Sequence, residues 1–312
     1  MLKYVLKRLG YILVTLWVIV TCTFFMMKNL PGTPFDAERF SIMTPQQQER
    51  VLEMYGLNDS LPMQYVKYIT NMLKGDLGTS FTYVNQDVSK VITGRLGPSA
   101  LIGIQAVLIG LAIGLILGIL AAWKHNSGID YFTMILAVLG VSVPNFVAAA
   151  LLQYYIGLKW GVLPVGFWTG WNCSVLPSIA LSFSATAMVA RFMRTEMLDV
   201  LDQDYIVTAR AKGLSQMKVL MRHAVRNSIL PVVTILGPIV VNLMTGSLAV
   251  ENIFSIPGIG SLFVDCIKAN DYPVIMGITI FYAAFYMLIV LLVDLAYSLI
   301  DPRIRLAKGK ES

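Results

Sequence analysis

The sequence predicts an all-α integral membrane protein with about six transmembrane helices. Hydrophobic residues make up 56% of the 312 positions and charged residues 13%, about half of the roughly 25% that is typical of soluble domains. Uncharged runs of 19 to 28 residues recur along the chain. A helix of that length can cross the roughly 30 Å hydrocarbon core of a bilayer. Much of the apolar surface is therefore expected to face lipid.

The predicted helices follow one another through most of the chain. Their expected ranges are Leu9–Met27, Leu96–Trp123, Tyr131–Leu158, a fourth helix beginning near Leu176, Ile229–Val250 and Val274–Ile300. The second is expected to open at Pro98-Ser99, a pair that suits a helix start. Pro144 predicts a kink near Ser142 to Asn145, which a membrane helix tolerates because neighbouring groups bond the freed carbonyl.

The distribution of basic residues predicts cytoplasmic N- and C-termini. Fifteen Lys and Arg residues fall in the termini, the 124–130 loop and the 191–226 segment, whereas the two short loops on the other side hold Lys159 and Lys268. Positively charged loops stay on the cytoplasmic side. The chain is therefore expected to cross the membrane several times.

The same pattern divides the chain into four parts. Residues 1–30 are expected to form the cytoplasmic N-terminus and the first membrane helix, and residues 31–95 an external loop. Two stretches of that loop, QQQERVLEMYG and PMQYVKYITNML, have helical character and predict a small external cap. Residues 96–306 form a five-helix core that contains a long loop at 199–231, and residues 307–312 form a cytoplasmic tail.

The scarcity of ionisable residues in the predicted helices argues against two classes of membrane protein. Asp294 lies in the last helix, and Arg191 and Arg194 end the fourth. Ion-coupled secondary transporters usually need intramembrane charges, so this class is disfavoured. A membrane enzyme is disfavoured as well, because His125 and His223 both fall in predicted loops and leave no catalytic constellation.

Metal and nucleic-acid binding are not predicted either. The three cysteines are scattered without the spacing of metal ligands. The net charge of +6 comes from basic residues that flank apolar runs rather than alternate with exposed aromatics. We therefore expect lipid, and no nucleic acid, as a partner.

Uncharged polar residues within the predicted helices have two interpretations. They could line a path for a polar cargo, or they could hydrogen-bond one helix to another. The set comprises Gln105, Ser142, Asn145, Gln153, Ser182, Ser184, Asn242 and Thr245. Ser142, Asn145 and Asn242 are the candidates for a translocation path. A stripe of Gly110, Gly114 and Gly118 predicts close helix packing.

The segment Asp199–Pro231 is the most informative part of the sequence. Asp202 or Asp204 can cap a short helix over Tyr205–Lys212, and Gly213 suits a left-handed stop. The small residues Thr208, Ala209 and Ala211 would let this helix enter a groove of another protein, with Tyr205 and Ile206 as anchors. The alternative is an amphipathic helix on the lipid headgroups, supported by the nearby Lys and Arg residues.

This segment resembles the EAA loop of ABC importer permeases, whose coupling helix fits a cleft in the cytoplasmic ATPase subunit. The pattern D-Y-x-x-T-A-x-A-K-G-L followed by R-H-A-x-R-N-x-x-x-P is similar to the dipeptide and oligopeptide branch. Thr208, Ala209, Ala211 and Gly213 match its small-residue and glycine positions. Val207, where many members have Glu, and Arg226, where the broad pattern has Leu-Pro, depart from the wider family in the way this branch does.

Other regions extend the resemblance over nearly the whole chain. They are the first 25 residues with LPGTPF, then GDLGTSF, VSVPNF, LPSIALS, ENIFSIPGIG and IDPRIRL. Together they resemble the first permease subunit of oligopeptide systems and imply the type I ABC importer fold.

The resemblance implies a function, a set of partners and a multi-pass location in the bacterial plasma (inner) membrane. The chain would be a non-catalytic permease without a cofactor, paired with a second, similar permease. Two ATPase subunits would carry ATP and Mg, and an extracellular protein would deliver peptides. A dipeptide or nickel permease is the alternative within the family. Bulky residues at Ala209 or Gly213 are expected to abolish uptake.

Overall fold

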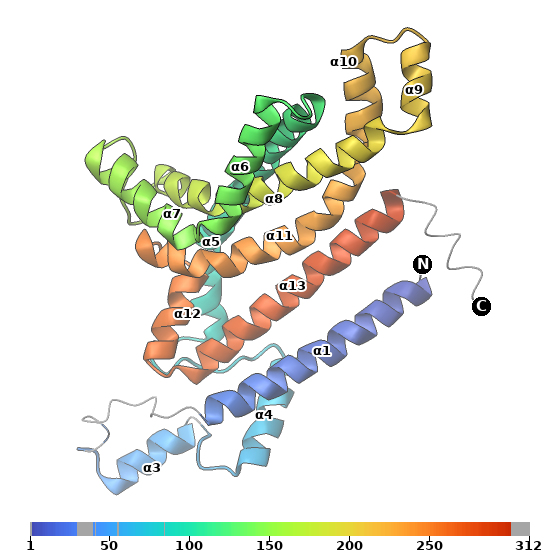
Figure 1. Cartoon of the computed structure of the whole chain (residues 1–312). Helices are drawn as coiled ribbons and strands as arrows, with labels where there is room; N and C mark the ends of the chain where they lie inside the picture. Colours follow the sequence, from blue (N-terminus) through green and yellow to red (C-terminus); the bar gives the residue numbers. More distant parts are fainter. Residues whose placement is uncertain (1, 30–39, 41, 55, 84, 301–312) are drawn as a thin grey trace. The chain divides into compact units, whose positions relative to one another are not determined.

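The computed structural model describes residues 2–29, 40, 42–54, 56–83 and 85–300, with the backbone alone at 2–5, 54, 242, 244–247, 294 and 296–300 (Figure 1). All long elements in this part of the chain are helices. Five of them are long and apolar enough to cross a membrane, and a bent pair supplies a sixth span if it is counted as one. The prediction of an all-α membrane protein with about six spans is confirmed.

The long helices are α1 (Leu2–Lys28), α5 (Val88–Trp123), α8 (Val175–Leu201), α11 (Arg226–Ile253) and α13 (Tyr272–Ile300). The bent pair consists of α6 (Gly128–Ser142) and α7 (Asn145–Leu152), the second continued by a π-helical turn at Gln153–Lys159. The shorter helices are α3 (Pro45–Met54), α4 (Leu61–Leu73), α9 (Asp204–Ala211), α10 (Gln216–Val219) and α12 (Ile259–Lys268). By its contacts the chain forms two compact units, Met1–Gly97 with Ser261–Met287, and Pro98–Gly260 with Leu288–Ser312.

The predicted start of the second span was wrong. Helix α5 begins at Val88, so Pro98 lies inside the helix rather than at its first turn. Proline removes one backbone hydrogen bond from a helix interior. Before Pro98, burial of Val88 and Ile92, which are 0% and 3% exposed, stabilises the additional turns. Hydropathy missed these turns because they also carry Lys90 and Arg95.

The break expected at Pro144 is present and is larger than a kink. The axes of α6 and α7 differ by 100°. Beyond the break, the side-chain amide of Gln153 donates hydrogen bonds to the carbonyl of Val165 (2.6 Å) and to that of Ile253 (2.8 Å). The second of these carbonyls belongs to the last residue of α11, where helix carbonyls lack intrahelical partners.

Helix α8 is the central helix of the unit Pro98–Gly260. The most apolar window of its span is 67% buried, compared with 11 to 33% in the other four long spans. The glycine stripe of α5 packs against it. A Cβ atom at Gly114 would lie 2.7 Å from the Cβ of Val189, and one at Gly118 would lie 2.7 Å from the carbonyl oxygen of Ala190. The prediction that these glycines permit close helix packing is confirmed.

The unit Met1–Gly97 with Ser261–Met287 contains the helices that were predicted to form a cap. Helices α3 and α4 confirm its helical character. Helix α4 packs on the end of α1, where the Phe24 ring meets the rings of Tyr65 (5.4 Å between centroids) and Tyr68 (5.9 Å). Thr21 and the hydroxyl of Tyr65 are also hydrogen-bonded, at 2.7 Å. These contacts fix the position of α4 on α1.

The GDLGTSF stretch is held at the start of α13 by the buried carboxylate of Asp271. This group accepts hydrogen bonds from the hydroxyl of Ser80 and from the backbone N–H groups of Phe81 (3.2 Å) and Thr82 (3.0 Å). Asp271 is itself 0% exposed and directly precedes α13. The loop and the helix start therefore form one hydrogen-bonded structure. The motif LPGTPF and residues 301–312, with the predicted tail at 307–312, lie outside the described residues.

Candidate functional site

The predicted short helix in the segment Asp199–Pro231 is present as α9. Its N-cap is Gln203, in an extended conformation (φ −78°, ψ 146°), and no side chain makes a capping hydrogen bond there. The prediction that Asp202 or Asp204 caps the helix was wrong. Asp204 is instead the first helical residue, where its charge is favourable near the positive end of the helix dipole.

Gly213 ends α9 in the left-handed conformation that the sequence predicted, with φ of +75°. The N–H of Leu214 bonds the carbonyl of Ala209 (3.4 Å), and the N–H of Gly213 bonds that of Arg210 (3.0 Å). This pair of bonds is the Schellman motif, which satisfies the last carbonyls of a helix. The chain consequently turns back sharply toward α10 (Figure 1).

One face of α9 is buried within the chain. Ile206 is 0% and Ala209 is 6% exposed, and they form a cluster with Val219 of α10. Val200 and Leu201, at the end of α8, pack against this cluster. Ile206 and Ala209 therefore fasten α9 to α8 and α10 and are not available to another protein. An Ala209→Trp substitution would first disturb this internal packing.

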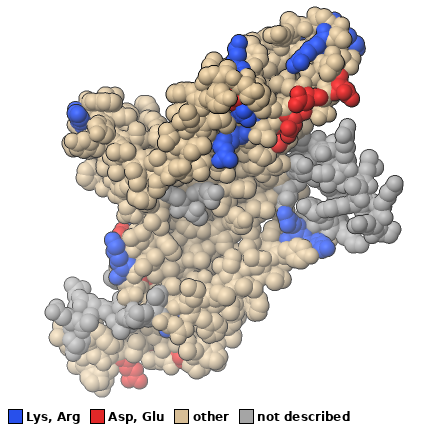
Figure 2. Space-filling model, viewed as in Figure 1, with Lys and Arg blue, Asp and Glu red and all other residues tan. Residues whose placement is uncertain are grey.

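The other face of α9 is exposed. Tyr205, Thr208, Ala211 and Gly213 all lie on it, so the structure separates the six predicted coupling residues into four exposed and two buried ones. Small side chains at Thr208 and Ala211 leave this face flat. Figure 2 shows both basic and acidic side chains at the end of the molecule that carries α9 and α10.

A hydrogen bond that the sequence did not reveal joins α9 to α11. The side-chain amide of Asn227, in the first turn of α11, donates to the hydroxyl of Tyr205 at 3.0 Å. The next residue, Ser228, donates to the carbonyl of Glu196 on α8 (3.3 Å). The R-N-x-x-x-P pattern contained Asn227, but a bond between residues 22 positions apart depends on the turn at Gly213.

An ion pair that the sequence did not predict joins α6 to α8. Asp130 is 2% exposed, and its carboxylate receives two hydrogen bonds from the Arg194 guanidinium, at 2.5 and 2.7 Å. The Nδ1 atom of His125 lies 3.1 Å from the same carboxylate. Two parallel bonds to one carboxylate fix both distance and orientation. From the sequence, Asp130 was expected in the 124–130 loop, and no partner was predicted for Arg194.

The loop ENIFSIPGIG surrounds a buried carboxylate. Glu251 is 0% exposed and accepts a hydrogen bond from the hydroxyl of Ser99 at 2.8 Å. The same hydroxyl accepts the N–H of Ile259, also at 2.8 Å. Gly258 lies so close to the Glu251 carboxylate that a side chain would not fit. Gly258 is therefore needed for this close approach.

The candidate path residues lie on α6, α7 and α11. Ser142 is exposed at the end of α6, Asn145 is half-buried at the start of α7, and the side chain of Asn242 on α11 lies outside the described residues. Their role stays a prediction. Two other polar residues join elements to one another: Gln153 as above, and Gln105, whose side-chain oxygen accepts the Ser178 hydroxyl at 2.8 Å.

The helices that pack on α8, together with the exposed α9 beyond its end, have the fold of a type I ABC importer permease. A crystal structure of an amino acid ABC transporter with histidines aligns with 69% of this chain and 94% of its own, with a TM-score of 0.52 and 20% identity. The two chains therefore share a fold.

The chain belongs to the family of binding-protein-dependent transport system inner membrane components, whose model matches residues 114–306. The model of the N-terminal part of such membrane components matches residues 1–96. The chain is therefore a multi-pass inner-membrane permease of the ABC importer class, and it is a non-catalytic subunit.

Curated relatives are similar over nearly their full length. The dipeptide transport system permease protein DppB of Lactococcus lactis subsp. cremoris (strain MG1363) is 46% identical over 98% of this chain and 100% of its own. The protein of that name from Bacillus subtilis (strain 168) is 43% identical over 99% of each chain. The oligopeptide transport system permease protein OppB of Haemophilus influenzae is 39% identical over 98% of this chain and 100% of its own.

Proposed function

We propose that this chain forms one half of the translocation path of an ATP-driven importer of oligopeptides. The relatives named as peptide permeases, at 38 to 46% identity over nearly the whole chain, support a peptide cargo. Dipeptides are the second candidate, because the relatives named for dipeptides share 46 and 43% of their residues with this chain, compared with 39% for OppB of Haemophilus influenzae.

The observation that carries the proposal is the attachment of α9. Its exposed face is available to another protein, while its buried face is packed on the end of α8 and Tyr205 is hydrogen-bonded to α11. A force applied to α9 would therefore reach two membrane helices. We assign coupling to the exposed Tyr205, Thr208, Ala211 and Gly213, and positioning of the helix to Ile206 and Ala209.

The proposed partners follow from the separate roles of the exposed and the buried face of α9. A second, similar permease completes the path, and two cytoplasmic ATPase subunits bind ATP and Mg and receive α9. An extracellular peptide-binding protein delivers the cargo. This chain binds no cofactor and hydrolyses nothing in the proposed scheme.

Transport then follows a two-state mechanism. When ATP draws the ATPase subunits together, α9 moves with them and the attached helices change from inward-open to outward-open. ATP can shift this equilibrium only by binding one state better than the other. The chain contributes the mechanical connection and the walls of the path.

Substitutions at Ala211 test this proposal. Ala211 is exposed on α9, so Ala211→Trp adds bulk to the outer face without filling the internal cluster. We expect this variant to reach the membrane at the normal level and to lose labelled-peptide uptake and ATPase binding, whereas Ala211→Ser retains both. Normal uptake by the Trp variant would refute the coupling role of α9.

A further inference from the structure

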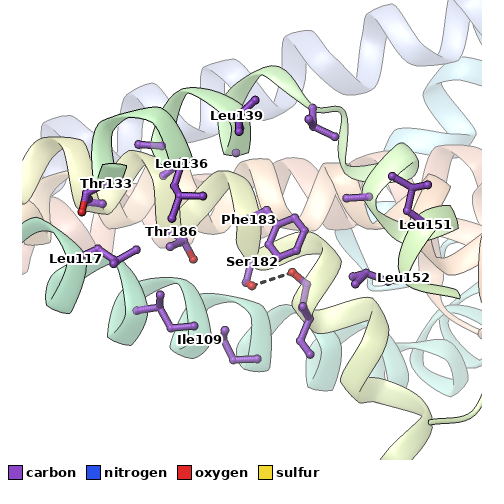
Figure 3. Close-up of a pocket in the computed structure, with 18 of the residues that line it drawn as sticks. Ile109, Leu117, Thr133, Leu136, Leu139, Leu151, Leu152, Ser182, Phe183 and Thr186 are labelled. Atoms are coloured by element: carbon purple, nitrogen blue, oxygen red, sulfur yellow. Dashed lines mark hydrogen bonds between the residues drawn. The ribbon is translucent and has the colours of Figure 1, made fainter. Parts of the chain in front are cut away.

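An apolar cavity of about 770 Å³ lies among α5, α6, α7 and α8. Figure 3 shows that Ile109 and Leu117 of α5, Leu136 and Leu139 of α6, and Phe183 and Thr186 of α8 form its walls. All four helices belong to spans that can cross a membrane. The cavity is open at its side, since Leu139 is 52% and Leu151 is 51% exposed.

Water is a poor occupant of this cavity. A buried water molecule needs two to four polar partners. The hydroxyl side chains of the lining are Thr133, Tyr155, Ser182 and Thr186, and that of Ser182 already donates to the carbonyl of Ile179 at 2.8 Å. An unfilled cavity would also deprive its apolar lining of dispersion contacts. An apolar occupant is therefore required.

The length of the cavity matches an acyl chain in one leaflet. Along α8 its lining runs from Ile179 to Ala190, or about 16 Å at roughly 1.5 Å per residue. One leaflet of the hydrocarbon core is about 15 Å thick.

One end of the cavity has the chemistry of a membrane interface. Tyr155 and Trp160 line it, with ring centroids 6.4 Å apart. The ammonium group of Lys159 lies 5.6 Å from the centre of the Tyr155 ring. Aromatic rings with a neighbouring cation are typical of the headgroup level, and the cation complements a phosphate charge.

We propose that this cavity holds one acyl chain of an anionic phospholipid, with its headgroup beside Lys159. The tail fills the space among α5, α6, α7 and α8, and it passes Gly140, where a Cβ atom would lie 3.0 Å from that of Ala187. The lipid completes the packing that the 100° bend between α6 and α7 leaves open. The leaflet is the one opposite α9, because Lys159 precedes α8 and α9 follows it.

Native mass spectrometry of the full importer tests this inference. The complex is loaded into nanodiscs of phosphatidylglycerol and phosphatidylethanolamine and then transferred to detergent. We expect the wild type to retain phosphatidylglycerol. Thr186→Phe and Leu139→Trp, which fill the cavity from opposite walls, should each lose the bound lipid. Retention at the wild-type level in either folded variant would overturn the proposal.

The headgroup contact has its own control. Lys159→Gln should lower the preference for phosphatidylglycerol about fivefold, the equivalent of the roughly 1 kcal/mol that a basic residue contributes near anionic lipid. Lys268→Gln, at another exposed helix end, should leave it unchanged. Equal effects of the two substitutions would exclude the Lys159 contact.

A photo-crosslinker separates lipid from protein as the occupant. Benzoylphenylalanine at position 139 in the assembled importer should form adducts with phospholipid. Adducts with the second permease instead would show that a protein surface covers the cavity, and the proposal would fail. Neither result depends on which cargo the importer carries.

Discussion

The hydroxyl of Tyr205 on α9 and the side-chain amide of Asn227 on α11 are hydrogen-bonded at 3.0 Å. The bond crosses the sharp turn at Gly213 and joins the exposed helix directly to the start of a membrane helix. The packing of Ile206 under α9 provides the parallel connection to α8. Motion of α9 therefore has two separate routes into the membrane part of the chain.

Breaking this bond is expected to weaken transport without removing the protein from the membrane. Tyr205→Phe keeps the ring and deletes the acceptor, at a cost of about 0.5 to 1.5 kcal/mol for a typical hydrogen bond. We expect labelled-peptide uptake to fall about two- to tenfold. Asn227→Ala should have a similar effect.

The double variant decides whether the two residues act through one bond. Two residues in one interaction give non-additive effects, so Tyr205→Phe with Asn227→Ala should be no worse than either single variant. Thr70→Val removes a hydroxyl that bonds only carbonyls of its own helix and serves as the control. A double variant whose loss is the product of the single losses would contradict the coupling.

Glycine positions on α5 provide a matched pair for helix packing. At Gly118 a Cβ atom would lie 2.7 Å from the Ala190 carbonyl oxygen and from the Met193 Cβ, whereas no atom lies within 4 Å of the corresponding position at Gly103. Gly118→Ala should therefore cost about 1 to 3 kcal/mol through overpacking. Gly103→Ala should be neutral or stabilising by up to about 1 kcal/mol. Thermal unfolding of the detergent-solubilised protein measures both, and equal melting temperatures would contradict the packing of α5 on α8.

Local signals predicted much of the fold and of the candidate site. The α8 start, the short helix α9 and the stop at Gly213 each follow from the chemistry of a few adjacent residues. The glycine stripe on α5 predicts close helix packing even when the partner helix is unknown, because small residues let another backbone approach.

What could not be predicted depends on contacts between distant parts of the chain. Pro98 is typical of a helix start, but the burial of Val88 and Ile92 extends α5 on the N-terminal side of this proline. Ile206 looked like an anchor for a partner protein, since periodicity shows that a face is apolar but not which protein covers it. The partner of Asp130 lies 64 residues away, so no local pattern indicates it.

The ion pair between Asp130 and Arg194 is expected to be needed for stability. Removing one member of a buried pair leaves an uncompensated charge and costs about 3 to 5 kcal/mol. Arg194→Met should accordingly lower the amount of folded protein in the membrane. Asp130→Asn in the same chain should restore much of it, because the neutral amide needs no counter-charge.

The exposed Arg191 lies one turn earlier on α8 and provides the control. Arg191→Met should leave the level of folded protein unchanged. If Arg194→Met were as stable as Arg191→Met, the ion pair would contribute nothing measurable, as is common for exposed pairs.

Cys266 on α12 is expected to resist thiol reagents over a wide pH range. Burial, followed by the negative charges of Asp271 and Asp265, raises the pKa of its thiol from 9.0 to about 12. The thiolate is the reactive form, and the raised pKa lowers the thiolate fraction at pH 8. With Cys22 and Cys173 replaced by serine, maleimide at pH 8 should leave Cys266 unlabelled in the folded protein and label it after denaturation.

The control variant Cys266→Ser with Ile267→Cys moves the thiol to a neighbouring position that is 46% exposed. This thiol should be labelled without denaturation. Similar rates at the two positions would contradict the buried environment of Cys266, because burial and the raised pKa both act to slow its reaction.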